Sequence, residues 1–172
     1  MKHLRPFSNN IIFFDTEFSG FDVCADELLS VGMVKAGGEE LYLEIEHRGS
    51  ASAWVRKNVL PLLSGPRVSR TQAKRKIRAF VGKSSPFIVS YVNDFDAVYL
   101  LRLFAPASPP FHWIPIDFAS MLFAMGVSPE SFDWRDKDNF FRKLGIDRAK
   151  YREHHALDDA RLLRDVYVKL LR

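Results

Sequence analysis

Two acidic residues stand two positions apart at the end of an apolar run near the start of the chain. The segment reads FFDTEFSG at 13–20, with Asp15 and Glu17 on either side of Thr16. Because successive side chains of a β-strand point to opposite faces, both carboxylates share one face. Carboxylates at the edge of a core are costly unless a positive group meets them. Hard divalent cations prefer oxygen ligands, so the pair predicts a Mg²⁺ or Mn²⁺ site, with solvation or pairing to Lys or Arg as the alternative.

A second acidic pair lies in YVNDFDAVYL at 91–100, directly after a predicted strand. In a helix, Asp96 shares the stripe that faces the core, together with Tyr99, Leu100, Leu103 and Phe104. Asp94 lies near the start of the same helix, where an aspartate suits the N-cap. We therefore assign Asp96 to the site and Asp94 to the cap, with the exchange of these two roles as the alternative.

The third acidic pair follows two histidines in EHHALDDARLL at 153–163. Helical spacing places Asp159 on an apolar stripe that should face the sheet, with Leu163, Val166 and Leu170. Asp158 falls on a more polar stripe and should face water. His154 and His155 precede the helix, so a loop would leave an imidazole free to reach a ligand. His154 is the candidate, with a purely structural hydrogen bond, or an exchange of roles with His155, as alternatives.

The elements that carry these residues follow from hydrophobic periodicity and turn signals. Strands are predicted at 11–17, 28–36, 40–46, 86–92 and 111–117. Helices are predicted at 52–63, 69–83, 94–105, 118–126, 138–146 and 155–171. Gly37 and Gly38 indicate a hairpin, and Ser69 with Gln72 has the spacing of a capping box. Three hairpin-linked strands followed by strand–helix alternation predict an α/β fold, with a five-stranded mixed sheet flanked by helices.

Composition narrows the class of protein. A chain of 172 residues is predicted to form a single domain over 1–172. The single cysteine, Cys24, excludes an internal disulfide and a Cys-rich zinc site, and it fits a cytoplasmic location. We find no secretory signal and no run long enough to cross a membrane, so no membrane partner is expected. A net charge of +4 and a pI near 9.3 favour a polyanionic partner such as nucleic acid.

Taken together, the three acidic segments resemble the motifs of the DEDDh family of 3′–5′ exonucleases. Asp15-Thr16-Glu17 matches its Asp-x-Glu motif, and Phe95-Asp96 matches its second motif. The stretch HHALDDA at 154–160 matches His-x-Ala-Leu-x-Asp-Ala. The resemblance spans residues 11–172. One difference is that the second motif often has an Asn four residues before its Asp, where this chain has Val92.

The resemblance implies a ribonuclease H-like fold and a metal-dependent 3′–5′ exonuclease that releases nucleoside 5′-monophosphates from single-stranded nucleic acid. It implies two Mg²⁺ or Mn²⁺ ions that stabilise the attacking and leaving oxygens. Asp15 would bridge both ions, Glu17 and Asp159 would bind one, and Asp96 would complete the shell of the other. His154 would be the general base, a role that suits an imidazole near neutral pH.

The 3′ end of single-stranded RNA or DNA is the implied partner. Phe18 is the candidate residue to stack on the terminal base, ahead of Phe21, and a place in the core is the alternative for both. The stretch DTEFSG is similar to RNA-degrading members of the family, which favours RNA slightly over DNA. The compact size is similar to that of oligoribonucleases and implies a homodimer. Two alternatives stay open: a non-catalytic nucleic-acid-binding module of the same fold, and a phosphodiesterase for mono- or dinucleotides. Six basic residues form a run that is either a phosphate-attracting surface or a solvated helix face: Arg67, Arg70, Lys74, Arg75, Lys76 and Arg78.

Overall fold

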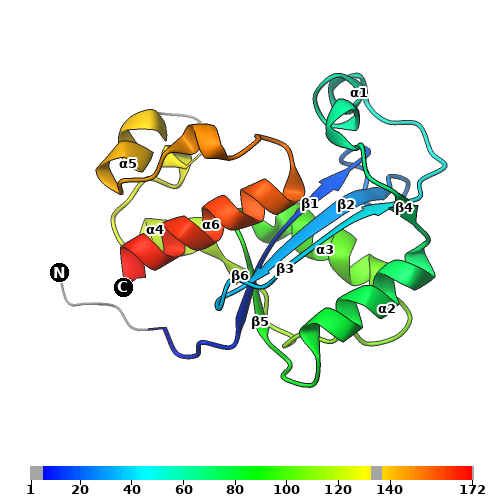
Figure 1. Ribbon diagram of the computed structural model, residues 1–172, viewed down its shortest axis with the longest axis horizontal. Coiled ribbons are helices and arrows are strands. Elements are labelled where there is room, and N and C mark those ends of the chain that lie inside the picture. Colours follow the sequence, from blue (N-terminus) through cyan, green and yellow to red (C-terminus); the bar gives the residue numbers. More distant parts are fainter. Residues whose placement is uncertain (1–5, 133–136, 172) are drawn as a thin grey trace.

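In the part of the chain that the structure describes, six strands form one mixed sheet in the order β4-β3-β2-β1-β5-β6 (Figure 1). The computed structural model describes residues 6–132 and 137–171. β1, β2 and β3 pair in antiparallel fashion, whereas β4 is parallel to β3, and β5 and β6 continue parallel to β1. The strands are β1 (Ile11–Phe18), β2 (Leu28–Lys35), β3 (Glu40–Ile45), β4 (Arg67–Val68), β5 (Phe87–Ser90) and β6 (Ile116–Asp117).

The predicted mixed sheet is confirmed, but the predicted count of five strands is wrong. β4 contributes only two residues at the edge of the sheet, which is too short to show an alternating pattern. The strand predicted at 111–117 pairs with β5 only at Ile116 and Asp117. Prolines at 109, 110 and 115 lack an N–H for the ladder, which explains why pairing begins only after Pro115.

Within the described ranges, six α-helices accompany the sheet, close to their predicted positions. They are α1 (Ala53–Asn58), α2 (Arg70–Val81), α3 (Asn93–Phe104), α4 (Phe118–Ala124), α5 (Lys137–Lys143) and α6 (Ala156–Leu171). α1 is shorter than expected because the chain changes to a 3₁₀ turn at Leu60–Leu62, where Pro61 lacks a donor. The capping box of Ser69 and Gln72 is confirmed at the start of α2. Within the described residues, every helix is too short or too polar to cross a membrane.

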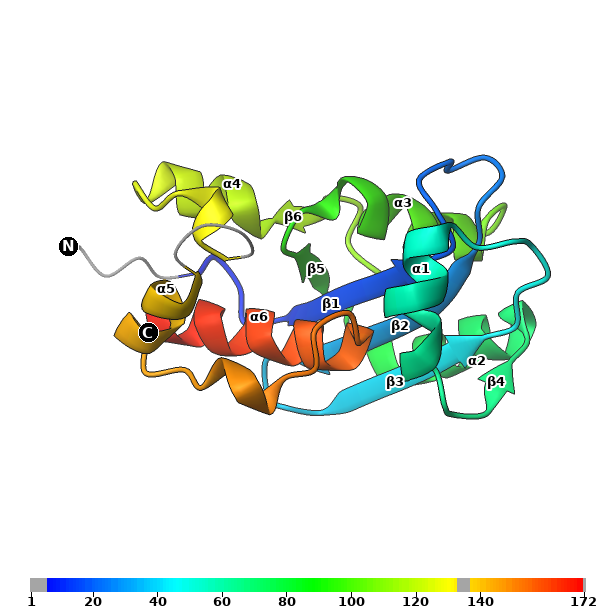
Figure 2. The same ribbon diagram turned by 90° about the horizontal axis from the view of Figure 1, so that it is seen from above.

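The side chains of β1 alternate between two hydrophobic cores, one on each face of the sheet. Ile12 and Phe14 pack in the core covered by α2 and α3. Ile11 and Phe13 pack in the core covered by α4 and α6. Figure 2 shows α6 lying along the sheet beside β1 and β2. The same period of two directs Asp15 and Glu17 toward α6 and Thr16 toward α3.

Candidate active site

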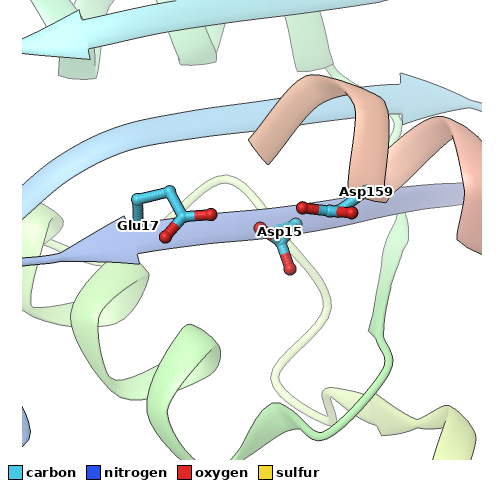
Figure 3. Close-up of side chains that lie close together, drawn as sticks. All are labelled: Asp15, Glu17 and Asp159. Carbon is cyan, nitrogen blue, oxygen red and sulfur yellow. The ribbon is translucent and has the colours of Figure 1, made fainter. Parts of the chain in front are cut away.

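Three carboxylates converge where β1 meets the first turn of α6. Asp15, Glu17 and Asp159 each offer one carboxylate oxygen, and these oxygens lie within 4.8 Å of one another (Figure 3). Glu17 is buried, whereas Asp15 and Asp159 are partly accessible. We call this group the acidic cluster. It joins the first and third motifs, which are more than 140 positions apart in the sequence.

The acidic cluster lines a pocket of about 690 Å³. Besides the cluster, the pocket wall includes two other residues predicted for the site, Asp96 and His154. Phe18 also lines it, so the six predicted site residues surround one cavity. A cavity of this size can admit a nucleotide-sized ligand.

Asp96 reaches the pocket from the opposite face of β1. It is 8 % exposed, and its Oδ1 accepts hydrogen bonds from Thr16 N at 3.0 Å and Thr16 Oγ1 at 2.5 Å. One carboxylate oxygen is therefore bound to the strand, and Asp96 stands apart from the three-residue acidic cluster. The two hydrogen bonds orient the carboxylate beside Glu17.

The predicted N-cap role of Asp94 is wrong. α3 begins at Asn93, its N-cap residue Val92 provides no side-chain hydrogen bond, and Asp94 is exposed in the first turn. The acceptor for Asn93 N is instead Asp117 Oδ1, at 3.2 Å. Asp117 lies 24 positions along the chain and also caps α4. Local spacing could not identify a cap supplied by a neighbouring strand end.

Burial and mutual repulsion of its acidic side chains make the pocket a candidate cation site. Burial, together with the charges of Asp159 and Asp96, raises the pKa of Glu17 well above its ordinary value. Burial raises the pKa of Asp159 to about 7, although the Arg148 guanidinium opposes this. Burial raises the pKa of Asp96 to about 7 as well, against its hydrogen bonds from Thr16. A divalent cation would offset the repulsion, and an oxygen-only donor set suits Mg²⁺ or Mn²⁺.

His154 enters the pocket on the loop before α6. Its backbone has φ +61°, a left-handed conformation that is uncommon for residues other than glycine. Its ring meets the edge of Trp54 in α1, with centroids 4.8 Å apart at 84°. His155 is buried outside the pocket and stacks on Tyr42 in β3, with centroids 4.5 Å apart. Of the two histidines, His154 is therefore the one that can reach a ligand in the pocket.

The prediction that Asp158 faces water is wrong. Asp158 is 4 % exposed, and both of its oxygens are engaged by arginines. Arg152 Nε donates to Oδ2 at 2.7 Å, and Arg161 Nη1 donates to Oδ1 at 2.6 Å. The helical stripe predicted its neighbours on α6 but not the loop that folds back over the helix start. Arg152 lies in that loop, where it covers Asp158 and places a positive charge beside its carboxylate.

Aromatic rings form another wall of the pocket. Phe18 stacks on Tyr99 with centroids 4.5 Å apart and 10° between planes. Phe21 is 73 % exposed and meets the rings of Phe18 and Phe95 edge-on. Phe18 is thus held from behind by Tyr99, and Phe21 is the more accessible ring of the wall.

Sequence motifs did not indicate Trp54 and Arg148, which also line the pocket. Among the described residues that line the pocket, Arg148 is the only lysine or arginine. Its Nη1 donates to Tyr151 O at 2.8 Å, and its Nη2 lies 3.9 Å from Glu153 Oε1. Neither residue belongs to a motif or a regular stripe, so nothing in the sequence spacing distinguishes them from ordinary surface residues.

The basic run, which extends from Arg67 in β4 into α2, lies away from the pocket. Arg70, Lys74 and Arg78 recur every four residues and donate to the carbonyl oxygens of Arg102, Ala105 and Ser108. None of the six residues of the run lines the described pocket wall. This stripe therefore holds the end of α3 and the segment after it, a favourable place for cations.

Comparison of the sequence with family models and with curated proteins finds no match. Solved structures of E. coli exonuclease I are similar in fold. The zinc-bound form of its complex with single-stranded DNA has a TM-score of 0.69 at 15% identity, over 94% of this chain and 40% of that one. The complex with a dT13 oligonucleotide has a TM-score of 0.68 at 16% identity, over 94% of this chain and 40% of that one. This chain thus spans about two fifths of those proteins, and it shares with that part of them the ribonuclease H-like fold predicted from its motifs.

Proposed function

We propose that this protein is a metal-dependent 3′–5′ exonuclease that releases nucleoside 5′-monophosphates from single-stranded nucleic acid. The observation that carries the proposal is the convergence of Asp15, Glu17 and Asp159 in one pocket with His154. The shared fold with exonuclease I, which has been solved with single-stranded DNA, supports the same reading. Neighbouring acidic side chains with raised pKa values in one pocket are characteristic of a catalytic site.

Mg²⁺ or Mn²⁺ is the proposed cofactor. Asp15, Glu17 and Asp159 would hold the metal, and Asp96 would contribute from the other side of β1. When bound, the metal lowers the pKa of a water molecule and stabilises charge on the phosphate. The raised pKa values of Glu17 and Asp159 agree with a cation site whose carboxylates repel one another when no cation is bound.

The remaining pocket residues suit the other tasks of phosphodiester hydrolysis. His154 is the proposed general base, which accepts a proton from the attacking water through its imidazole nitrogen. The aromatic wall, formed by the partly buried Phe18 and the exposed Phe21, would stack on the terminal base. Arg148 carries the positive charge that a phosphate oxygen would meet at the cluster's edge.

The proposal extends to the sugar of the substrate, ribose or deoxyribose. The similarity of DTEFSG to RNA-degrading exonucleases favours RNA slightly. The exonuclease I complexes contain single-stranded DNA, which supports DNA as a substrate too. Contacts to the 2′-hydroxyl would decide between the two.

A time course on 5′-labelled single-stranded RNA and DNA of the same sequence tests the proposal. With Mg²⁺ or Mn²⁺ we expect a ladder that shortens from the 3′ end, and with EDTA no shortening. Asp15→Asn is the matched inactive control. Oligomer binding without metal-dependent shortening would replace the proposal with a non-catalytic binding module. Hydrolysis confined to mono- or dinucleotides would replace it with a small-substrate phosphodiesterase.

A further inference from the structure

A buried carboxylate outside the pocket holds the loop that carries His154. Asp158 Oδ2 accepts from Arg152 Nε at 2.7 Å and from Arg152 N at 3.4 Å. Its Oδ1 accepts from Arg161 Nη1 at 2.6 Å. Asp158 itself does not line the described pocket wall, so its carboxylate is not available to a ligand there.

The two residues around His154 that Asp158 controls are Arg152 and His155. Arg152 Nη2 lies 3.0 Å from His155 Nε2, and His155 Nδ1 lies 3.6 Å from Asp158 Oδ2. The backbone adds to this, since His155 N donates to Arg152 O and Asp158 N donates to His155 O. The Asp158 carboxylate and the Arg152 guanidinium thus hold the loop both before and after His154.

The same network fixes the loop to the sheet. Arg161 bridges Asp158 to Glu40 at the start of β3, with Nε to Oε1 at 2.8 Å. The His155 ring stacks on Tyr42, two residues along the same strand. Burial and the Arg152 charge lower the pKa of His155, so its ring is neutral near pH 7 and packs on Tyr42 without a charge to solvate. These contacts therefore fix the position of the loop relative to β3, which pairs with β2 beside β1.

His154 hydrogen-bonds through its backbone to the Asp159 carboxylate, but its backbone conformation is strained and its ring lies against a half-exposed residue. It adopts the left-handed φ of +61°, which is unfavourable for a residue with a Cβ. Its ring approaches Trp54 edge-on, and Trp54 is itself half exposed. A strained backbone at a functional residue persists where the surrounding structure fixes it.

We propose that Asp158 is a positioning residue, which fixes the loop through Arg152 and His155 and so aims His154 at the reacting phosphate. The inference rests on the proposed exonuclease function. Partners that orient the ligands of a metal site typically contribute 10- to 100-fold to activity, and we expect an effect of the same order for a partner that orients His154. Buried ion pairs are weak evidence for stability alone, since well-packed apolar residues often replace them.

A double-mutant cycle separates positioning from simple folding. Asp158→Asn keeps the shape of the side chain and removes its charge. We expect it to lower kcat about 10- to 100-fold with little change in KM. In a His154→Ala background the same change should lower kcat less than about twofold, because the residue that Asp158 positions is gone. Equal losses in both backgrounds would overturn the proposal.

Two further variants protect the test from a folding artefact. Arg152→Lys keeps the charge at an exposed residue but loses the Nε donor, and we expect a smaller fall in kcat with an unchanged melting temperature. Ser69→Ala removes the cap of α2 on the far side of the sheet, and it should lower the melting temperature while kcat stays unchanged. A loss of kcat in Ser69→Ala that matches the loss in Asp158→Asn would assign both effects to stability.

Hydrogen exchange gives a readout that needs no activity. In Asp158→Asn, amides of the loop 151–155 should exchange faster, whereas those of β1 and β2 should not change. Unchanged exchange in the loop would overturn the proposal. An inactive wild-type protein would defeat the proposed function, and the exchange of the loop would still show whether Asp158 holds it.

Discussion

Gly32 in β2 lies directly against Ala156, the first residue of α6. A Cβ built on Gly32 would stand 2.3 Å from the carbonyl carbon and oxygen of Ala156, a distance that no packed side chain tolerates. Gly32 is also the residue that pairs with Asp15 across the β1–β2 ladder. The missing side chain therefore lets α6 touch the sheet at the position where Asp159 must meet Asp15.

We expect Gly32→Val to displace the start of α6 and separate Asp159 from Asp15. Overpacking of this kind costs about 1–3 kcal/mol of unfolding free energy. Since a misplacement near 1 Å can lower the rate about 100-fold, activity should fall at least that far. Denaturant unfolding and the exonuclease assay measure the two effects. Met33→Leu, a volume-conserving change on the other face, is the control, and full activity in Gly32→Val would contradict the role given to this contact.

Glu17→Gln should make the metal-free protein more stable and abolish metal-dependent activity. Burial and the charges of Asp159 and Asp96 raise the pKa of Glu17, so a neutral amide relieves repulsion at pH 8. Thermal melting in EDTA, compared with the nuclease assay in Mn²⁺, tests both halves. Glu39→Gln, at an exposed side chain paired with Lys35, should change neither. A lower melting temperature for Glu17→Gln would show that the carboxylate is stabilising.

Stability without metal should fall as the pH rises from about 4 to about 8. The pKa values of Asp96 and Asp159 are raised to about 7 in the folded protein, against 3.8 as ordinary values. The folded state then binds protons more tightly than the unfolded state, so this contribution is complete below about pH 4 and is lost through about pH 7. Melting in EDTA across this range measures the fall in wild type, and Asp159→Asn should show a smaller one.

Metal affinity should change in the opposite direction. The cluster must lose protons before it binds a cation, so the affinity for Mn²⁺ should rise between pH 6 and pH 8. Calorimetry in two buffers of different ionisation enthalpy counts the protons released on binding. An affinity independent of pH would mean that the acids are already ionised in the metal-free protein.

Thr16→Val should weaken the site through Asp96. The change removes the Oγ1 donor to Asp96 Oδ1 and keeps the donor on the Thr16 backbone nitrogen. A hydrogen bond to a charged group contributes about 1.5–3 kcal/mol, and we expect a loss of kcat of about 10-fold. Thr16→Ser keeps the hydroxyl and should retain most of the activity. An equal loss in Thr16→Ser, which keeps the Oγ donor, would contradict the role given to this hydrogen bond.

Arg148→Gln should raise KM for oligonucleotides more than it lowers kcat. The guanidinium lies in the pocket wall beside Asp159, where it can meet a phosphate oxygen. The loss of one phosphate contact should also reduce the salt dependence of binding by about one unit of slope. Binding titrations between low and moderate salt measure this. Arg75→Gln, on the exposed face of α2 away from the pocket, should leave KM and the slope unchanged.

Local sequence determined most of the elements and the directions of several side chains at the pocket. Alternation fixed the faces of Asp15, Glu17 and Thr16, because side-chain direction in a strand depends only on its period of two. The capping box at Ser69 was readable for a similar reason, since both partners lie three residues apart. The helical stripe correctly separated Asp96 from Asp94, although it gave Asp94 a cap role that it does not have.

The tertiary structure alone decided where long-range partners come from. Asp158 lies on the polar stripe of α6, yet it is buried because Arg152 and Arg161 neutralise it within the folded loop. Asp117 caps α3 from another strand end, and Gly32 admits α6 from a strand more than 120 positions away. Sequence periodicity reports which way a side chain points within its own element. It carries no information about which distant element arrives on that side, and here that arrival assembles the site.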